Sequence, residues 1–304
     1  MDTTKVYIMS LPRSGSTLIG QQLGMHEDIV HMGETMYWEL LSPRDKSCSC
    51  GKRPCPILMN LGKEITSQHM ALPLLKAWQA TEMKYWPEKK WVAESSIFTK
   101  RPTGMMDSAE LAGWLDRCPQ ALDKIVSIYK KEFDASVIVD NTKLFAVAER
   151  LVDRPSWKIL ILLRDPRGVM ASYKKAGERK GDMRDPRGII KFCEDFMQSV
   201  SSISKLDNSL IVRYEDFCDN PPQVLKEICS FLNEPYENRV VKPFNRKEGT
   251  AGHVLMGNRI LWKDALTNFQ IDTSWEHGLD KREIDLLTSH KSLMSQYAEY
   301  GYSF

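Results

Sequence analysis

The chain has 304 residues, 42% of them hydrophobic, which is enough for one large α/β domain or two smaller ones. Its net charge of +2 gives no general case for a nucleic-acid polymer or a membrane as partner, and its longest aliphatic run, Ile159 to Leu163, is too short to span a bilayer. Seven cysteines, an odd number, favour a reducing, cytoplasmic location.

The first predicted element is a buried strand at Val6 to Met9, a run too short for a helical period. A polar turn follows from Ser10 to Thr17, and the apolar spacing from Leu18 to Leu23 predicts a helix that ends at Gly24. Backbone N–H groups of such a turn and the helix dipole favour an anion at this point. Arg13 adds a fork of donors suited to phosphate or sulfate oxygens.

The turn matches part of the phosphate-binding loop G-x-x-x-x-G-K-[ST]. Gly15 and Thr17 match, Ser10 stands at the first glycine, and Ser16 replaces the lysine that would reach a γ-phosphate. The turn therefore predicts a site for a phosphate-like group without the equipment of an ATPase. The alternative is a plain connecting turn.

A second short strand is predicted at Ile29 to Met32, and Gly33-Glu34-Thr35 leaves it. The ends of neighbouring parallel strands commonly face one crevice, so Glu34 is expected near the anion site. The alternative is a solvated loop carboxylate, the usual position of a glutamate.

Cys48, Cys50 and Cys55 form a C-x-C-x4-C cluster. A zinc site needs four ligands, usually in paired C-x2-4-C motifs, and the sequence nearby offers no fourth ligand. No metal site is therefore predicted, and a buried loop or a disulfide are the alternatives.

Residues 64–132 are expected to form a mostly helical insert. With Trp38 just before it, this segment holds five of the eight tryptophans, the others being Trp78, Trp86, Trp91 and Trp114. They can line an apolar pocket, although packing in the core is more usual. Acidic and basic residues are equal in number between residues 66 and 123, which argues against a highly sulfated or phosphorylated polymer as a ligand.

Two further strands are predicted at Ser136 to Val139, followed by Asp140-Asn141-Thr142-Lys143, and at Trp157 to Leu163. The second is almost continuously apolar, as in a parallel sheet covered on both faces. It ends at Arg164, and Asp165 is expected to cap a helix that begins at Pro166.

Ser172 follows Asp165 by seven residues and lies on the same helix face, so Arg164 and Ser172 can both reach an anion there. The pentapeptide Arg-Asp-Pro-Arg-Gly occurs at Arg164 to Gly168 and again at Arg184 to Gly188. The second copy follows no strand, so it is predicted to be a surface loop before a helix from about Ile189 to Lys205.

The last predicted strand is Leu210 to Val212, and Asn220-Pro221-Pro222 starts a helix that ends near Leu232. A helical period also runs from Lys281 to Tyr297. Strands that alternate with helices, without a linker, predict a single α/β domain over residues 1–304 with a central parallel sheet flanked by helices.

Taken together, the two strand-to-helix junctions resemble those of the sulfotransferases that use 3′-phosphoadenosine 5′-phosphosulfate (PAPS). The motifs that carry the resemblance are Leu11 to Thr17, Arg164 to Gly168 with Ser172, Val212 to Asp216, and His253 with Gly257-Asn258-Arg259. The last of these is similar to the nucleotide-covering loop of the carbohydrate and bacterial branches. The cysteine cluster and Val139 to Lys143 also look bacterial.

The resemblance implies a P-loop-like sulfotransferase fold with residues 64–132 on the acceptor side and residues 240–304 as a nucleotide-covering segment. It implies that the first loop holds the 5′-phosphosulfate, that the strand-end arginine and the helix serine hold the 3′-phosphate, and that no metal is required. The implied PAPS-binding residues are Arg13, Ser14, Gly15, Ser16, Thr17, Leu18, Arg164, Ser172, Gly257, Asn258 and Arg259.

In the implied mechanism an acceptor hydroxyl attacks sulfur in line, and adenosine 3′,5′-bisphosphate (PAP) leaves. The tyrosine-sulfating branch has Gly-Glu-Glu-Thr after its second strand, and Gly33-Glu34-Thr35 is similar with one Glu fewer. Glu34 is therefore expected as the base, with His31 and His253 as alternatives. Lys143 resembles the lysine of that branch that supports the leaving oxygen.

Arg13 is expected to act in both binding and transfer. The expected acceptor is a hydroxyl, or an amine, of a bacterial small molecule or saccharide, and the sequence does not indicate the oligomeric state. One rival function is a P-loop kinase. Ser16 argues against it, because Ser16 stands where a P-loop kinase has its phosphate-binding lysine. The other is a non-catalytic PAP- or PAPS-binding protein, which would need neither Glu34 nor Lys143.

Overall fold

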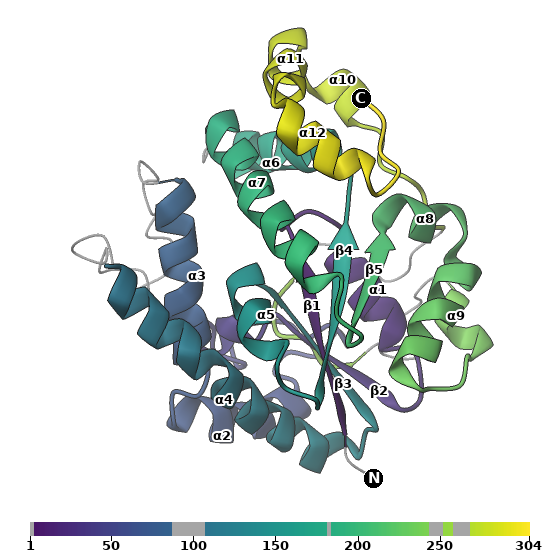
Figure 1. Ribbon diagram of the computed structural model, residues 1–304. Coiled ribbons are helices and arrows are strands. Elements are labelled where there is room, and N and C mark those ends of the chain that lie inside the picture. The colour runs from purple at the N-terminus through teal and green to yellow at the C-terminus, as the bar shows by residue number, and fades with distance from the viewer. Residues whose placement is uncertain (1–2, 87–106, 181–183, 243–251, 258–267) are drawn as a thin grey trace.

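A sheet of five parallel strands forms the centre of the fold (Figure 1). The strands are β1 (Thr4–Ser10), β2 (Ile29–Gly33), β3 (Val137–Lys143), β4 (Trp157–Leu163) and β5 (Ser209–Arg213). Their order in the sheet is β2-β3-β1-β4-β5. The computed structural model describes residues 3–86, 107–180, 184–242, 252–257 and 268–304.

All five predicted strands are confirmed, but β3 is longer than predicted. The polar residues after Val139 continue the pairing with β1, with Asp140 opposite Tyr7 and Lys143 opposite Met9, across an irregularity in register. They read as a loop in the sequence because polar residues are unusual inside a buried parallel strand.

Helices and 3-10 turns connect the strands. The described helices are α1 (Ser16–Leu23), α2 (Pro56–Ser67), α3 (Leu72–Tyr85), α4 (Ser108–Phe133), α5 (Phe145–Leu151), α6 (Pro166–Lys180), α7 (Pro186–Ile203), α8 (Tyr214–Asp219), α9 (Pro221–Leu232), α10 (Trp275–Gly278), α11 (Lys281–Ser289) and α12 (Lys291–Ala298), and the 3-10 turns are η1 (Thr35–Glu39) and η2 (Asn238–Val241). Within this described part, no helix is both long and apolar enough to cross a membrane.

The sheet is covered on both faces, as its apolar strands predict. Figure 1 shows α5 and α7 in front of the sheet and α1 behind it. Alternate side chains of β1 enter two separate cores: Tyr7 and Met9 belong to the core of the first face, and Val6 and Ile8 belong to the core of the second. This alternation follows from the two-residue period of a strand.

The helical insert between β2 and β3 begins earlier than predicted, since Pro56 starts α2 at the position where proline is favoured. Trp38 and Trp86 are buried in the core, in agreement with the plainer prediction for the tryptophans. Residues 87–106, which include Trp91, lie outside the described residues.

The second Arg-Asp-Pro-Arg-Gly copy precedes a helix, as predicted, but the helix begins within it, about three residues earlier than expected. The Asp185 carboxylate accepts the backbone N–H of Arg187 at 2.9 Å and caps α7, which begins at Pro186. The side chain of Arg184 is only 16% exposed; it forms an ion pair with Glu82 at 2.9 Å and stacks on Trp86. The motif is itself a cap-and-proline signal, so it starts a helix whether or not a strand precedes it.

Candidate active site at the carboxyl ends of the strands

The turn after β1 has the geometry of an anion site. The N–H groups of Leu18 and Ile19 donate to the carbonyl of Gly15 at 2.9 and 3.1 Å, so the amides just before them lie at the open start of α1. Gly15 has a φ of 92°, and a Cβ there would lie 2.5 Å from the Tyr214 ring. Both features require glycine at this position, which is more than a plain connecting turn needs.

Positive charge gathers at this turn. Burial lowers the pKa of Arg13, and the nearby charges of Arg184 and Arg179 act in the same direction. The Arg13 guanidinium therefore lies near two other arginines, of which Arg184 is itself paired with Glu82. Arg13 also has a left-handed φ of 77°, a conformation that costs a non-glycine residue about 1–3 kcal/mol and that is concentrated at functional sites.

Glu34 and Lys143 meet at the ends of the neighbouring strands β2 and β3. The Lys143 Nζ lies 2.7 Å from Glu34 Oε1, and the two side chains are only 9% and 12% exposed. Lys143 Nζ also donates to the Asn141 carbonyl at 3.2 Å, and its residue has a φ of 76°. Lys143 pairs with Met9 in the register of β3 and β1, so the ion pair lies beside the end of β1.

A buried hydrogen-bond network that the sequence analysis missed lies next to this pair. Thr35 Oγ1 donates to Asp140 Oδ2 at 2.7 Å, and the Thr142 N–H donates to Asp140 Oδ1 at 2.8 Å. Burial raises the pKa of Asp140 to about 6. Since Thr35 follows Glu34 and Thr142 precedes Lys143, the network holds both residues of the ion pair. The sequence feature that could have indicated this network is the threonine beside each predicted catalytic residue, Thr35 next to Glu34 and Thr142 next to Lys143.

Arg164, at the end of β4, links the β1 turn to the C-terminal segment. Its Nη1 donates to the Arg13 carbonyl at 2.7 Å, its Nη2 donates to Asp272 Oδ2 at 3.0 Å, and its guanidinium lies over the Tyr214 ring. Asp272 was not predicted, because only the fold brings it to this strand end. The Arg164 guanidinium therefore lies beside the turn, as an anion-binding residue must.

The helix after Arg164 begins as predicted, with Asp165 Oδ1 accepting the Arg167 N–H at 2.8 Å. Ser172 lies in α6 and is half-buried. Joint binding of one anion by Arg164 and Ser172 stays a prediction. Gly257 ends a described segment, and Asn258 and Arg259 lie outside the described residues.

The two histidine alternatives for the base lie in different surroundings. His31 belongs to β2, and its fully buried side chain packs against α1, where a Cβ on Gly20 would lie 2.4 Å from its Nε2. Burial lowers the pKa of His31 to about 3. His253 Nδ1 faces Cys48 and Cys55. A general base must reach a substrate proton, so the partly exposed Glu34 at a strand end fits the role better than His31.

Comparison with known proteins identifies the family of the chain. A family model described as "Sulfotransferase family" matches residues 5–238. Carbohydrate sulfotransferase 1 of Rattus norvegicus is 25% identical over 273 residues, which cover 79% of this chain and 66% of that protein. Its counterpart in Mus musculus is 26% identical over 271 residues, which cover 78% of this chain and 65% of that protein. The chain thus spans slightly less than two thirds of the length of these relatives.

A solved structure shows the same fold. The sulfotransferase domain from the curacin biosynthetic pathway matches with a TM-score of 0.51 and 18% identity, over 100% of this chain and 99% of that one. This likeness confirms the predicted sulfotransferase fold, with its central parallel sheet flanked by helices. Because the family model also matches more than half of its residues, the chain belongs to the sulfotransferase family.

Proposed function

We propose that the protein transfers a sulfuryl group from PAPS to a hydroxyl or amine of an acceptor and releases PAP. The observation that carries the proposal is the 2.7 Å contact between Glu34 and Lys143 beside the Arg13 turn. In-line transfer needs a base for the acceptor proton and fixed cations for the leaving group, and this strand end supplies both. A non-catalytic nucleotide-binding protein would have no use for the carboxylate.

The described residues fit the donor. The open start of α1, the small side chains of the turn and the Arg13 guanidinium suit the 5′-phosphosulfate, while Arg164 and Ser172 are assigned to the 3′-phosphate. Bound PAPS would supply the activated sulfuryl group. The proposed binding residues remain Arg13, Ser14, Gly15, Ser16, Thr17, Leu18, Arg164, Ser172, Gly257, Asn258 and Arg259.

In the proposed reaction, Glu34 accepts the proton of the acceptor hydroxyl. Lys143 has three N–H donors, of which one faces Glu34 and one faces the Asn141 carbonyl. Within the described residues this leaves a donor for the oxygen that gains negative charge. Arg13 supplies further positive charge at the same point.

We propose a saccharide or a hydroxylated small molecule as the acceptor. The matching relatives are carbohydrate sulfotransferases. The pKa of Tyr37 is raised by burial and then by Glu34, so an aromatic side chain lies near the proposed base, and the Tyr37 ring lies 6.4 Å from that of Trp78. Aromatic rings offer apolar area together with a polar tip, which suits a sugar.

A bacterial origin and a cytoplasmic location are also part of the proposal. The motifs around the cysteine cluster and Val139 to Lys143 support the first, by resemblance. None of the seven cysteines forms a disulfide in the structure, which supports the second.

The test of the proposed function is transfer of labelled sulfate from PAPS to a panel of saccharides and hydroxylated metabolites. We expect a labelled product and release of PAP in equal amounts. Transfer of labelled phosphate from ATP to the same panel would support the kinase alternative. Tight PAP binding without transfer to any member of a broad panel would support the non-catalytic alternative.

Arg164→Ala is expected to reduce the preference for PAP over 5′-AMP by about 10- to 100-fold. The change removes a charge-assisted contact to the 3′-phosphate, worth about 1.5–3 kcal/mol. Isothermal calorimetry with both nucleotides measures this preference. Arg150→Ala is a matched control, because Arg150 lies in the last turn of α5 and pairs with Asp116 of α4. If Arg164→Ala kept the wild-type preference for PAP over 5′-AMP, another residue would bind the 3′-phosphate.

Transfer is expected to proceed at the same initial rate with added magnesium or with EDTA. The positive charge that magnesium supplies to phosphoryl-transfer enzymes is supplied here by the fixed cations Lys143 and Arg13. Initial rates over a magnesium titration check this expectation. A rate that falls at once in EDTA and returns with magnesium would contradict it.

A further inference from the structure

Four possible metal ligands meet beside the insert. The Sγ atoms of Cys48, Cys50 and Cys55 and a ring nitrogen of His253 all lie within 4.8 Å of one another. We propose that these four side chains bind one structural Zn²⁺ ion. The sequence analysis found no fourth ligand because it searched nearby, whereas His253 follows Cys55 by 198 residues and only the fold brings it there.

The spacing of the ligand atoms matches a tetrahedral zinc site. The Sγ atoms of Cys50 and Cys55 are 3.8 Å apart, and His253 Nδ1 lies 3.4 Å from Cys48 Sγ and 3.3 Å from Cys55 Sγ. Zinc–sulfur bonds of about 2.3 Å and zinc–nitrogen bonds of about 2.0–2.1 Å place tetrahedral ligands about 3.8 Å (S–S) and about 3.6 Å (S–N) apart. A disulfide needs a separation of about 2.05 Å, so the cysteine pair is not in disulfide geometry.

The loop that carries the cysteines is shaped to support thiolates. Cys48 and Lys52 enclose a tight turn in which the Gly51 N–H donates to the Cys48 carbonyl at 2.8 Å, with Gly51 at a φ of 88°. The Cys50 N–H points at Cys48 Sγ at 3.5 Å. Cys55 occupies the N-cap of α2, where the helix dipole favours negative charge. Donors and a dipole directed at sulfur are typical supports of metal-bound thiolates.

Ser49 forms hydrogen bonds with the residues on either side of His253, which are Gly252 and Val254. Its hydroxyl donates to the Gly252 carbonyl at 2.9 Å and accepts the Val254 N–H at 2.9 Å, and its own N–H donates to the Val254 carbonyl at 3.2 Å. The His253 ring is stacked at 5.9 Å from that of Phe133. The backbone on both sides of His253 is thus held in place by contacts that do not depend on the thiols.

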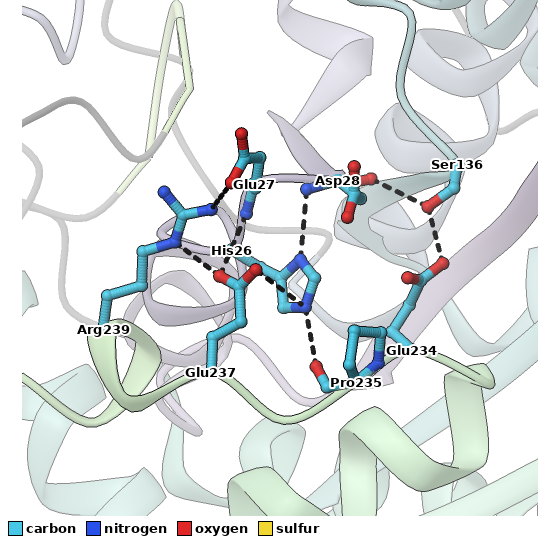
Figure 2. Close-up of polar contacts among 8 residues, drawn as sticks. All are labelled: His26, Glu27, Asp28, Ser136, Glu234, Pro235, Glu237 and Arg239. Carbon is cyan, nitrogen blue, oxygen red and sulfur yellow. Dashed lines mark hydrogen bonds and ion pairs between the residues drawn. The ribbon is translucent and has the colours of Figure 1, made fainter.

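A second group of candidate ligands, His26, Asp28 and Glu237, provides a contrast (Figure 2). His26 Nδ1 accepts the Asp28 N–H at 3.1 Å, so Nε2 carries the proton that it donates to the Pro235 carbonyl at 2.8 Å. Glu237 already pairs with Arg239 at 2.5 Å. Neither ring nitrogen has a lone pair to offer, so this group is a hydrogen-bond network. His253 Nδ1, in contrast, faces two soft sulfur atoms.

The proposed ion would join two parts of the candidate active site. The segment that carries His253 packs on the end of β2: a Cβ on Gly33 would lie 2.4 Å from the Val254 side chain, and a Cβ on Gly252 would lie 2.9 Å from the His31 carbonyl. Glu34 follows Gly33 directly. With four protein ligands the ion has no open position for substrate, so its role is structural. It would fasten residues 252–257 beside the proposed base.

The test is the metal content of the full chain, purified under reducing conditions without a metal-binding tag. We expect inductively coupled plasma mass spectrometry to find one zinc ion per chain. Replacement by Co²⁺ should give the intense ligand-field bands of a tetrahedral ion and sulfur-to-cobalt charge transfer. Cys50→Ser and His253→Ala should lose the ion, while His253→Cys should keep it with a changed cobalt spectrum. Cys229→Ser, at a buried thiol of α9, is the matched control and should keep one zinc.

Circular dichroism of each variant separates loss of the ion from loss of the fold, and His253→Cys keeps the test decisive if His253→Ala does not fold. Zinc-free wild-type protein that binds neither Zn²⁺ nor Co²⁺ after reconstitution would overturn the proposal. So would a stoichiometric ion that survives in both Cys50→Ser and His253→Ala. These measurements do not involve turnover, so their outcome is independent of the proposed transferase activity.

Discussion

Glu34→Gln is expected to lower kcat by about 10²–10⁴-fold, the usual cost of losing a general base. Glutamine keeps the shape of the side chain and its place beside Lys143, but it cannot accept the acceptor proton. PAP affinity should barely change, because a carboxylate has no favourable contact with a phosphate. Turnover with labelled PAPS at saturating acceptor, together with calorimetry of PAP binding, measures the two effects separately.

Glu39→Gln is the matched control for this change. Glu39 is a shielded carboxylate in the same turn, where it accepts from the Ala71 N–H at 3.2 Å and contacts His69 at 2.9 Å, and it has no proposed part in transfer. Its kcat should stay near that of the wild type. Near-normal turnover of Glu34→Gln would rule out Glu34 as the base.

Lys143→Ala is expected to slow transfer by about 10²–10³-fold and also to weaken PAP binding. The change removes a fixed positive charge from the oxygen that leaves, and electrostatic groups of this kind typically contribute that much to the rate. The loss of both kcat and nucleotide affinity distinguishes Lys143 from Glu34. The same pair of assays measures both quantities.

Lys5→Ala is the matched control, since Lys5 lies at the opposite end of β1 and pairs with Asp123. It should change neither kcat nor PAP affinity. Because Glu34 and Lys143 are in contact, their changes should not be additive, and the double variant should be less impaired than the product of the single effects. Fully additive losses would show that the contact between the two side chains has no part in transfer.

The strands and the main site residues could be predicted because their signals are local. Short apolar runs such as Ile159 to Leu163 define the parallel strands, and each polar residue that directly follows a strand lies at its carboxyl end. Glu34 was therefore expected near the anion site, whereas Lys143 was placed there only by its resemblance to the lysine of the tyrosine-sulfating branch. The structure brings the two side chains into contact although more than a hundred residues separate them in the chain.

What could not be predicted depends on contacts that no local pattern encodes. The Arg164 contact with Asp272 and the approach of His253 to the cysteines require the C-terminal segment to return to the sheet. Arg184 was predicted to lie in a loop, yet its side chain stacks on Trp86 and pairs with Glu82 because α3 and α7 pack together. The third strand was predicted to end before Asp140, because a buried acid in a strand is costly unless, as here, both of its carboxylate oxygens accept hydrogen bonds.

The strand order fixes the spacing of the site residues along the carboxyl ends of the strands. Glu34, Lys143, Arg13 and Arg164 follow or end β2, β3, β1 and β4, so they stand in this order along the edge although the chain visits Arg13 first. Three strand spacings of about 4.8 Å separate the first from the last, or about 14 Å. In the proposed reaction the acceptor lies near Glu34, at one end of this row of residues, and the 3′-phosphate lies near Arg164, at the other end. Helices α2, α3 and α4 all lie in the chain between β2 and β3, so a change in the length or sequence of this insert alters the segment that follows Glu34 and leaves the junctions after β1 and β4 in place.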